Sequence, residues 1–136
     1  MNRAQVADLL NLIASTDGRK LAQQMPAAWL DILGQYPYAD CRAAVVHHFQ
    51  TSTEWLMPAH IIRHVKQLRK DRLLAVRETV EPNRADTDDP TTYVETRRRL
   101  TQLIADGHVT ADDYRRYHTS GQPLADWIGQ GQLGAA

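Results

Sequence analysis

Residues 55–72 read Trp55-Leu56-Met57-Pro58-Ala59-His60-Ile61-Ile62-Arg63-His64-Val65-Lys66-Gln67-Leu68-Arg69-Lys70-Asp71-Arg72. Proline is well suited to the first position of a helix, where its missing N–H costs nothing. No glycine or second proline follows before Pro82. We therefore predict one long helix from Pro58 to about residue 80. At 100° per residue, one side of this helix carries seven apolar side chains: Ile61, Ile62, Val65, Leu68, Leu73, Val76 and Val80.

A stripe of cations runs beside this apolar face, and two more, Arg69 and Arg72, fall within the apolar sector itself. A fully buried helix would not place arginines there. We therefore expect the first half of the helix to pack in a core and the second half to project. Such a basic face usually serves only to solvate a helix. Here the positive charges cluster and negative charges follow, which favours contact with nucleic acid or an acidic partner. The candidate nucleic-acid-binding residues are Arg63, Lys66, Arg69, Lys70, Arg72 and Arg77.

Three further helices are predicted before this one. The first carries an apolar stripe and ends near Asp17-Gly18, a good helix terminator. The second begins at Pro26, and the third begins near Asp40, whose carboxylate suits the positive end of a helix dipole. No segment alternates as a strand would. We expect an all-α protein whose residues 1–80 form a compact four-helix domain. Its core should bring together Trp29, Phe49, Ile62 and Val65.

The segment 81–90 has the composition of an acidic linker, with two prolines, four acids and no large apolar residue. Residues 91–136 then form a small helical appendage with a frayed tail. Asp89-Pro90 resembles a cap followed by a first-turn proline. Thr110 and Asp113 resemble a capping box for a later short helix.

The appendage carries more apolar side chains than a free tail should expose. Its tryptophan could dock on the domain or anchor a partner, since aromatic anchors dominate the energetics of interfaces. We expect both: a hairpin that packs on residues 91–104 and is completed by another chain. The candidate partner-binding residues are Tyr114, Tyr117, Leu124, Trp127 and Ile128.

Composition sets outer limits on the function. The chain has 136 residues, 43% of them hydrophobic, and a formal net charge of zero, so no global field draws it to nucleic acid. The single cysteine excludes an internal disulfide and fits a reducing compartment. No apolar run approaches a membrane span, and the first residues lack the core of a signal peptide. We expect a cytoplasmic protein without a membrane partner.

Catalytic and metal sites are not indicated. His60 and His64 lie four apart on a helix, and Cys41 and His48 lie seven apart, but the paired close spacings of a zinc finger are missing. Cys41 is better explained as a small core hydrophobe than as a nucleophile. No glycine-rich phosphate loop or nucleophile elbow is present. We expect a protein that is not an enzyme and has no metal, cofactor or small-molecule substrate.

Three segments resemble a known family. They are Ala28-Trp29-Leu30-Asp31-Ile32-Leu33, Ala43-Ala44-Val45-Val46-His47-His48-Phe49 and Met57-Pro58-Ala59-His60-Ile61-Ile62, followed by Arg69 and Arg72. Over about residues 5–75 the layout is similar to the N-terminal domain of replicative-helicase loaders and inhibitors of the non-ATPase kind, from actinobacteria and their phages. The resemblance implies that the helical N-terminal part contacts a replication initiator or DNA, and that the C-terminal part holds the helicase.

The expected function is therefore that of a non-enzymatic DNA-replication adaptor, joining a replicative helicase to a replication initiator or to DNA. The alternative is a DNA-binding transcriptional or phage regulatory protein that uses the basic helix directly.

Overall fold

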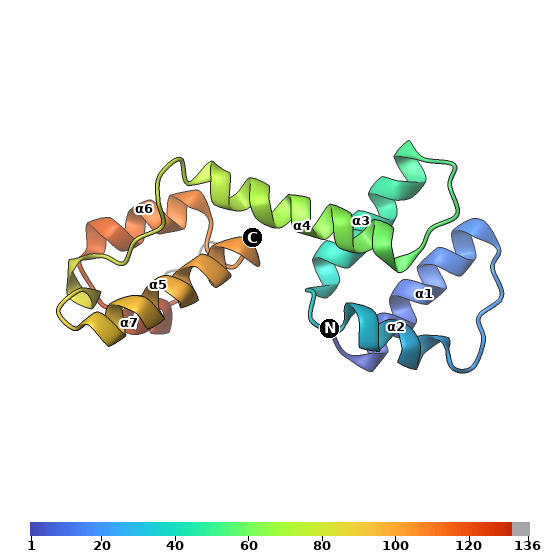
Figure 1. Ribbon diagram of the computed structural model, residues 1–136, viewed down its shortest axis with the longest axis horizontal. Helices are drawn as coiled ribbons and strands as arrows, with labels where there is room; N and C mark the ends of the chain where they lie inside the picture. The colour runs from blue at the N-terminus through green and yellow to red at the C-terminus, as the bar shows by residue number, and fades with distance from the viewer. Residues whose placement is uncertain (132–136) are drawn as a thin grey trace. The chain divides into compact units, whose positions relative to one another are not determined.

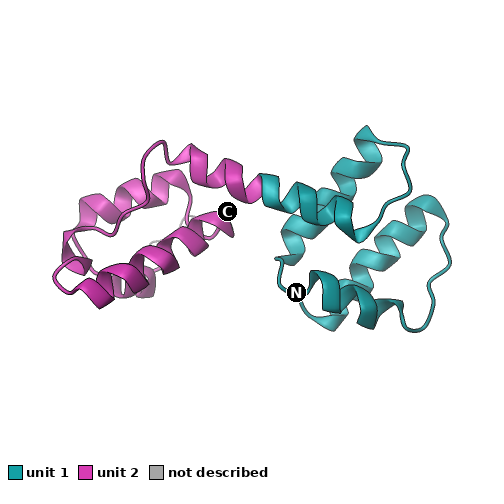
Figure 2. Ribbon diagram, in the orientation of Figure 1, with its two compact units in different colours: residues 1–67 teal, residues 68–136 magenta. Residues whose placement is uncertain are grey.

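The computed structural model describes residues 1–131, and these residues are all-helical, with no strand among them (Figure 1). The chain divides into two compact units, residues 1–67 (unit 1) and residues 68–136 (unit 2), with the boundary inside one helix (Figure 2). The α-helices are α1 Arg3–Asp17, α2 Met25–Leu33, α3 Tyr38–Thr51, α4 Pro58–Ala75, α5 Pro90–Ala105, α6 Ala111–Ser120 and α7 Leu124–Gly129, and one 3-10 helix spans Arg84–Asp86.

Unit 1 is built from α1, α2, α3 and the first half of α4. A capping box of Asn2 and Gln5 starts α1, and Gly18, in the left-handed region at φ 72°, ends it as predicted. α1 packs against α2 and α3. The core of unit 1 contains Val6, Leu9, Leu10, Ile13, Trp29, Leu33, Cys41, Ala44, Val45, Leu56, Ile61 and Val65. Trp29 and Val65 are buried as predicted, and Phe49 and Ile62 are half-buried against the same core.

Helix α4 is shorter than predicted, because it ends at Ala75 and not near residue 80. Arg77 adopts a left-handed φ of 62°, which an α-helix cannot continue through. The prediction that the second half of the helix projects is also wrong. From residue 68 onward the chain belongs to unit 2, where Val76 is buried and Leu73 packs against the same core.

The segment 81–90, predicted to be a linker, is packed into unit 2. Asn83 and Asp86 are buried. The Asn83 amide donates to the carbonyl oxygens of Tyr117 (3.1 Å) and Gln122 (2.7 Å). The Asp86 carboxylate accepts from the Tyr117 hydroxyl (2.8 Å) and from the Leu124 N–H (2.8 Å). The polar side chains that suggested solvation therefore satisfy buried groups of α6 and α7.

The predicted appendage is consequently part of a larger unit with one core. That core contains Val76, Leu100, Ile104, Val109, Tyr114, Tyr117, Leu124 and Trp127. The predicted caps of its helices are confirmed: Asp89 accepts from the Thr92 N–H at the start of α5, and Thr110 and Asp113 form the capping box of α6. The frayed tail was predicted to include residues 132–136, which lie outside the described residues.

Replacing Trp29 by alanine should destabilise unit 1 by about 3–5 kcal/mol, because it removes a large side chain that is only 7% exposed. Urea denaturation followed by circular dichroism measures the change. Trp55→Ala is the matched control: its side chain is 57% exposed, so its cost should be about 1 kcal/mol or less. Equal losses in the two variants would contradict the packing described for unit 1.

Tyr117→Phe should destabilise unit 2 by about 1–3 kcal/mol, because it leaves the buried Asn83 N–H, which donates to the Tyr117 hydroxyl (2.8 Å), without a partner. Burial raises the pKa of Tyr117 above its ordinary value. An unfolded tyrosine ionises near pH 10 while the folded one keeps its proton, so the wild type should lose stability as the pH rises above about 10. The variant should show a weaker alkaline loss. Thermal denaturation between neutral and alkaline pH tests this, and an unchanged profile would contradict it.

Candidate protein-binding groove

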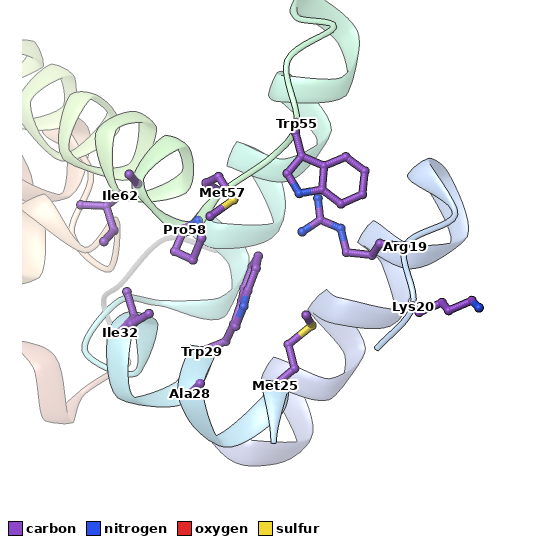
Figure 3. A pocket seen from close by; sticks show the side chains of 11 residues that line it. Arg19, Lys20, Met25, Ala28, Trp29, Ile32, Trp55, Met57, Pro58 and Ile62 are labelled. Atoms are coloured by element: carbon purple, nitrogen blue, oxygen red, sulfur yellow. The ribbon is translucent and has the colours of Figure 1, made fainter. Parts of the chain in front are cut away.

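An open groove of about 720 Å³ lies on unit 1 between α2 and the start of α4 (Figure 3). Its surface is almost wholly apolar. Cavities of this size accept drug-sized molecules or the side chains of a docked peptide. The groove is lined by Arg19, Lys20, Met25, Ala28, Trp29, Ile32, Trp55, Met57, Pro58, Ala59 and Ile62.

Large apolar side chains stand exposed in this groove. Trp55 is 57% exposed, Met57 is 49% exposed and Ile32 is 44% exposed. The indole of the buried Trp29 also lines the groove (Figure 3). Clustered apolar exposure is typical of surfaces that bind another molecule, whereas single exposed apolar residues need no explanation.

The exposed indole of Trp55 is held in place by Arg19. The Arg19 guanidinium lies 4.2 Å from the centre of the Trp55 ring, within cation–π range. It is paired with Asp17 (Nη2–Oδ2 2.6 Å) and donates to the carbonyl oxygen of Leu56 (2.9 Å). The hydrogen bonds from Arg19 lower the pKa of the Asp17 carboxyl below its ordinary value. Trp55 is thus a solvent-facing aromatic side chain on a fixed support.

Local sequence signals position both Arg19 and the loop that carries Trp55. Gly18 turns the chain out of α1, so that Arg19 follows directly and folds back on Asp17. On the other side, the N–H of Met57 donates to Nδ1 of His60 (2.9 Å), which satisfies a donor at the start of α4. Leu56 is buried between the exposed Trp55 and Met57, so the loop alternates between core and solvent.

The six predicted nucleic-acid-binding residues fall into two groups. Arg63 and Lys66 in unit 1 and Lys70 and Arg77 in unit 2 are exposed. Arg69 and Arg72 are half-buried in unit 2.

Both half-buried arginines are engaged near the end of α5. Arg69 forms an ion pair with Asp106, and Arg72 donates to the Ala105 carbonyl oxygen (3.0 Å). These two arginines therefore explain the charge in the apolar sector: they bind the C-terminal end of α5, where carbonyl oxygens carry a partial negative charge.

The predicted partner-binding residues lie in the core of unit 2. Tyr114, Tyr117, Leu124 and Trp127 are each at most 3% exposed, and Ile128 is half-buried against the same core. The expectation that they pack within the C-terminal part is confirmed. Four of the five are nevertheless covered by their own chain, so they offer a partner no surface in this fold.

Four histidines lie ring against ring in two pairs, and the cysteine is buried. His47 stacks on His64 with ring centres 4.4 Å apart, and His48 lies 4.7 Å from His60. Within residues 1–131, no three His, Cys, Asp or Glu side chains are grouped so that they could hold a metal ion. Burial raises the pKa of Cys41 to about 11, so its thiol stays protonated at neutral pH.

The groove was not predicted from the sequence. Its available signal was Trp55 and Met57 on either side of Leu56, immediately before the proline that begins a helix. These three apolar residues lie outside a helix, so helical periodicity does not indicate which of them are buried. The support from Arg19 comes from a distant part of the chain. The groove could therefore be recognised only in the three-dimensional structure.

No family model, curated protein or solved structure matches this chain. Within the described residues, no helix combines the length and the apolar character that crossing a bilayer requires.

Trp55→Phe should remove most of the tryptophan fluorescence that acrylamide can quench. The other two indoles are shielded, because Trp29 is 7% exposed and Trp127 is 2% exposed. Stern–Volmer titration of the wild type and the variant measures the accessible fraction. Trp127→Phe should leave the quenchable intensity in place and so raise the accessible fraction, because it removes only a shielded indole. An accessible fraction that survives in Trp55→Phe would contradict the exposure described here.

Proposed function

We propose that this protein is a non-enzymatic DNA-replication adaptor, similar to a helicase loader, which joins a replicative helicase to a replication initiator or to DNA in the cytoplasm. The observation that carries the proposal is the open apolar groove of unit 1, with Trp55 fixed and exposed within it. Apolar, aromatic-lined surfaces suit the capture of a protein, because a few buried aromatic anchors supply most of the binding energy at interfaces.

The adaptor acts by mass action. Binding two partners at once raises the effective concentration of each for the other, and no bond is made or broken. In this proposal the groove captures the protein partner. The exposed Arg63 and Lys66 are available for phosphate groups or for an acidic surface.

The proposal departs from the family resemblance in one respect. The resemblance implies that the C-terminal part holds the helicase. Tyr117 and Trp127 are buried in the core of unit 2, so we assign protein capture to unit 1 instead. Unit 2 retains exposed cations, such as Lys70 and Arg77, as a second surface.

Capture of the replicative helicase of the same host or phage should require Trp55. In a pull-down with the full-length chain, Trp55→Ala should weaken capture at least about tenfold, since it removes a central aromatic anchor. Val94→Ala is the matched control, because it truncates an exposed apolar side chain of unit 2, 62% exposed, and should leave capture unchanged. Absence of capture by the wild type would refute the adaptor, and equal capture by both variants would place the partner surface elsewhere.

The second candidate is a DNA-binding regulator, favoured by the exposure of Arg63 and Lys66 three positions apart on α4. If both contact phosphate, the log–log salt dependence of binding to duplex DNA should lose about 0.9 per removed contact in the double variant Arg63→Ala/Lys66→Ala. Fluorescence anisotropy between low and moderate salt measures the slopes. A wild type that does not bind DNA even at low salt removes this candidate and leaves the adaptor with a protein partner only.

A further inference from the structure

We propose that the groove of unit 1 binds a single amphipathic helix of another protein. The helix presents large apolar side chains at helical spacing and carries a carboxylate near Lys20. This inference rests on the proposed function, because it names the kind of segment that the protein partner supplies to the groove.

The apolar lining selects a helix over an extended peptide. An extended segment binds by pairing its backbone N–H and C=O groups with a partner, and burying them unpaired is costly. The groove is formed by apolar side chains and offers almost no polar surface for such pairing. A helix satisfies its own backbone internally and presents only side chains. Apolar groups at positions i, i+3 or i+4, and i+7 can therefore fill the groove without unsatisfied polar atoms.

Charge at the rim selects an acidic occupant. The charged residues that line the groove are Arg19 and Lys20, and no acidic residue lines it. The Arg19 charge is already paired with Asp17, and its side chain is only 5% exposed. Lys20 lines the groove and is exposed, and in Figure 3 its side chain extends away from the apolar lining residues, which places its charge at the periphery. A carboxylate at that end of the helix would gain a favourable interaction, whereas a cation would be repelled.

A second copy of this chain is a poor occupant. Its helix would need at least two exposed large apolar side chains at helical spacing. In residues 1–131 the exposed large apolar side chains on helices are Ile32 on α2, Leu74 on α4 and Val94 on α5, one for each helix. The remaining ones, Leu21, Trp55 and Met57, lie on loops. The occupant is therefore a different protein.

Arg19 acts in this proposal as a positioning residue. It fixes the Trp55 indole through its stack and its bonds to Asp17 and the Leu56 carbonyl, so less freedom is lost when the helix binds. Its removal should both weaken binding and loosen the indole. Loosening is measured separately, in the free protein, as faster tryptophan anisotropy decay in the double variant Arg19→Ala/Trp127→Phe than in Trp127→Phe alone.

The test uses the full-length chain and labelled peptides of about 18 residues, long enough to form helix in water. One series carries leucine, phenylalanine or tryptophan anchors at helical spacing with glutamates beside them. A second series has the same composition with strand-like alternation, and a third replaces the glutamates near one end by lysines. Fluorescence anisotropy should show binding by the first series and at least about tenfold weaker binding by the alternating series. Trp55→Ala should weaken binding of the first series to a similar extent. The lysine series should bind roughly two- to fivefold more weakly, because a single exposed charge pair contributes little. Val94→Ala should bind as the wild type does.

Four outcomes of the peptide titrations overturn the proposal: no binding by any helical peptide, equal binding by the alternating series, equal binding by the lysine series, or binding that Trp55→Ala leaves unchanged. Sedimentation of the chain as a dimer that Trp55→Ala dissociates would assign the groove to a second copy. The helicase pull-down tests the adaptor separately from the peptide titration. Peptide binding without helicase capture would refute the adaptor and leave the groove proposal standing. Helicase capture that does not depend on Trp55 would refute the groove proposal and leave the adaptor standing.

Discussion

The guanidinium of Arg19 connects the two segments of unit 1 that hold the exposed Trp55 at the groove. Arg19 follows the glycine that ends α1, pairs with Asp17, and reaches the Leu56 carbonyl in the loop before α4. Those contacts hold the guanidinium where it stacks on the Trp55 ring, while that side chain stays exposed. An arginine suits this position, because its planar fork can bind a carboxylate and a carbonyl while its face lies on an indole.

Much of the fold could be predicted because its signals are local. The end of α1 at Gly18, the start of α4 at Pro58 and the capping box of Thr110 and Asp113 each depend on residues only a few positions apart. Short-range hydrogen bonds and fixed φ angles decide such boundaries almost independently of the rest of the chain. The all-helical class follows from the same signals together with apolar periodicity.

The parts that could not be predicted depend on contacts between distant residues. Asn83 and Asp86 read as solvated side chains until Tyr117 and Leu124, more than thirty positions later, supply their hydrogen-bond partners. The arginines in the apolar sector of α4 are explained only by the end of α5. The groove depends on Arg19 meeting Leu56, 37 positions away. Composition and periodicity carry no information about such pairs.

The buried bonds of Asp86 also bear on when unit 2 can fold during synthesis, because its partners Tyr117 and Leu124 come late in the chain. Domains fold as their residues emerge, the N-terminal ones first. Unit 1 has every residue of its core once Val65 is free of the exit tunnel, whereas unit 2 must wait for Leu124 and Trp127. During that interval a nascent chain has the residues of its groove while the second core is still incomplete.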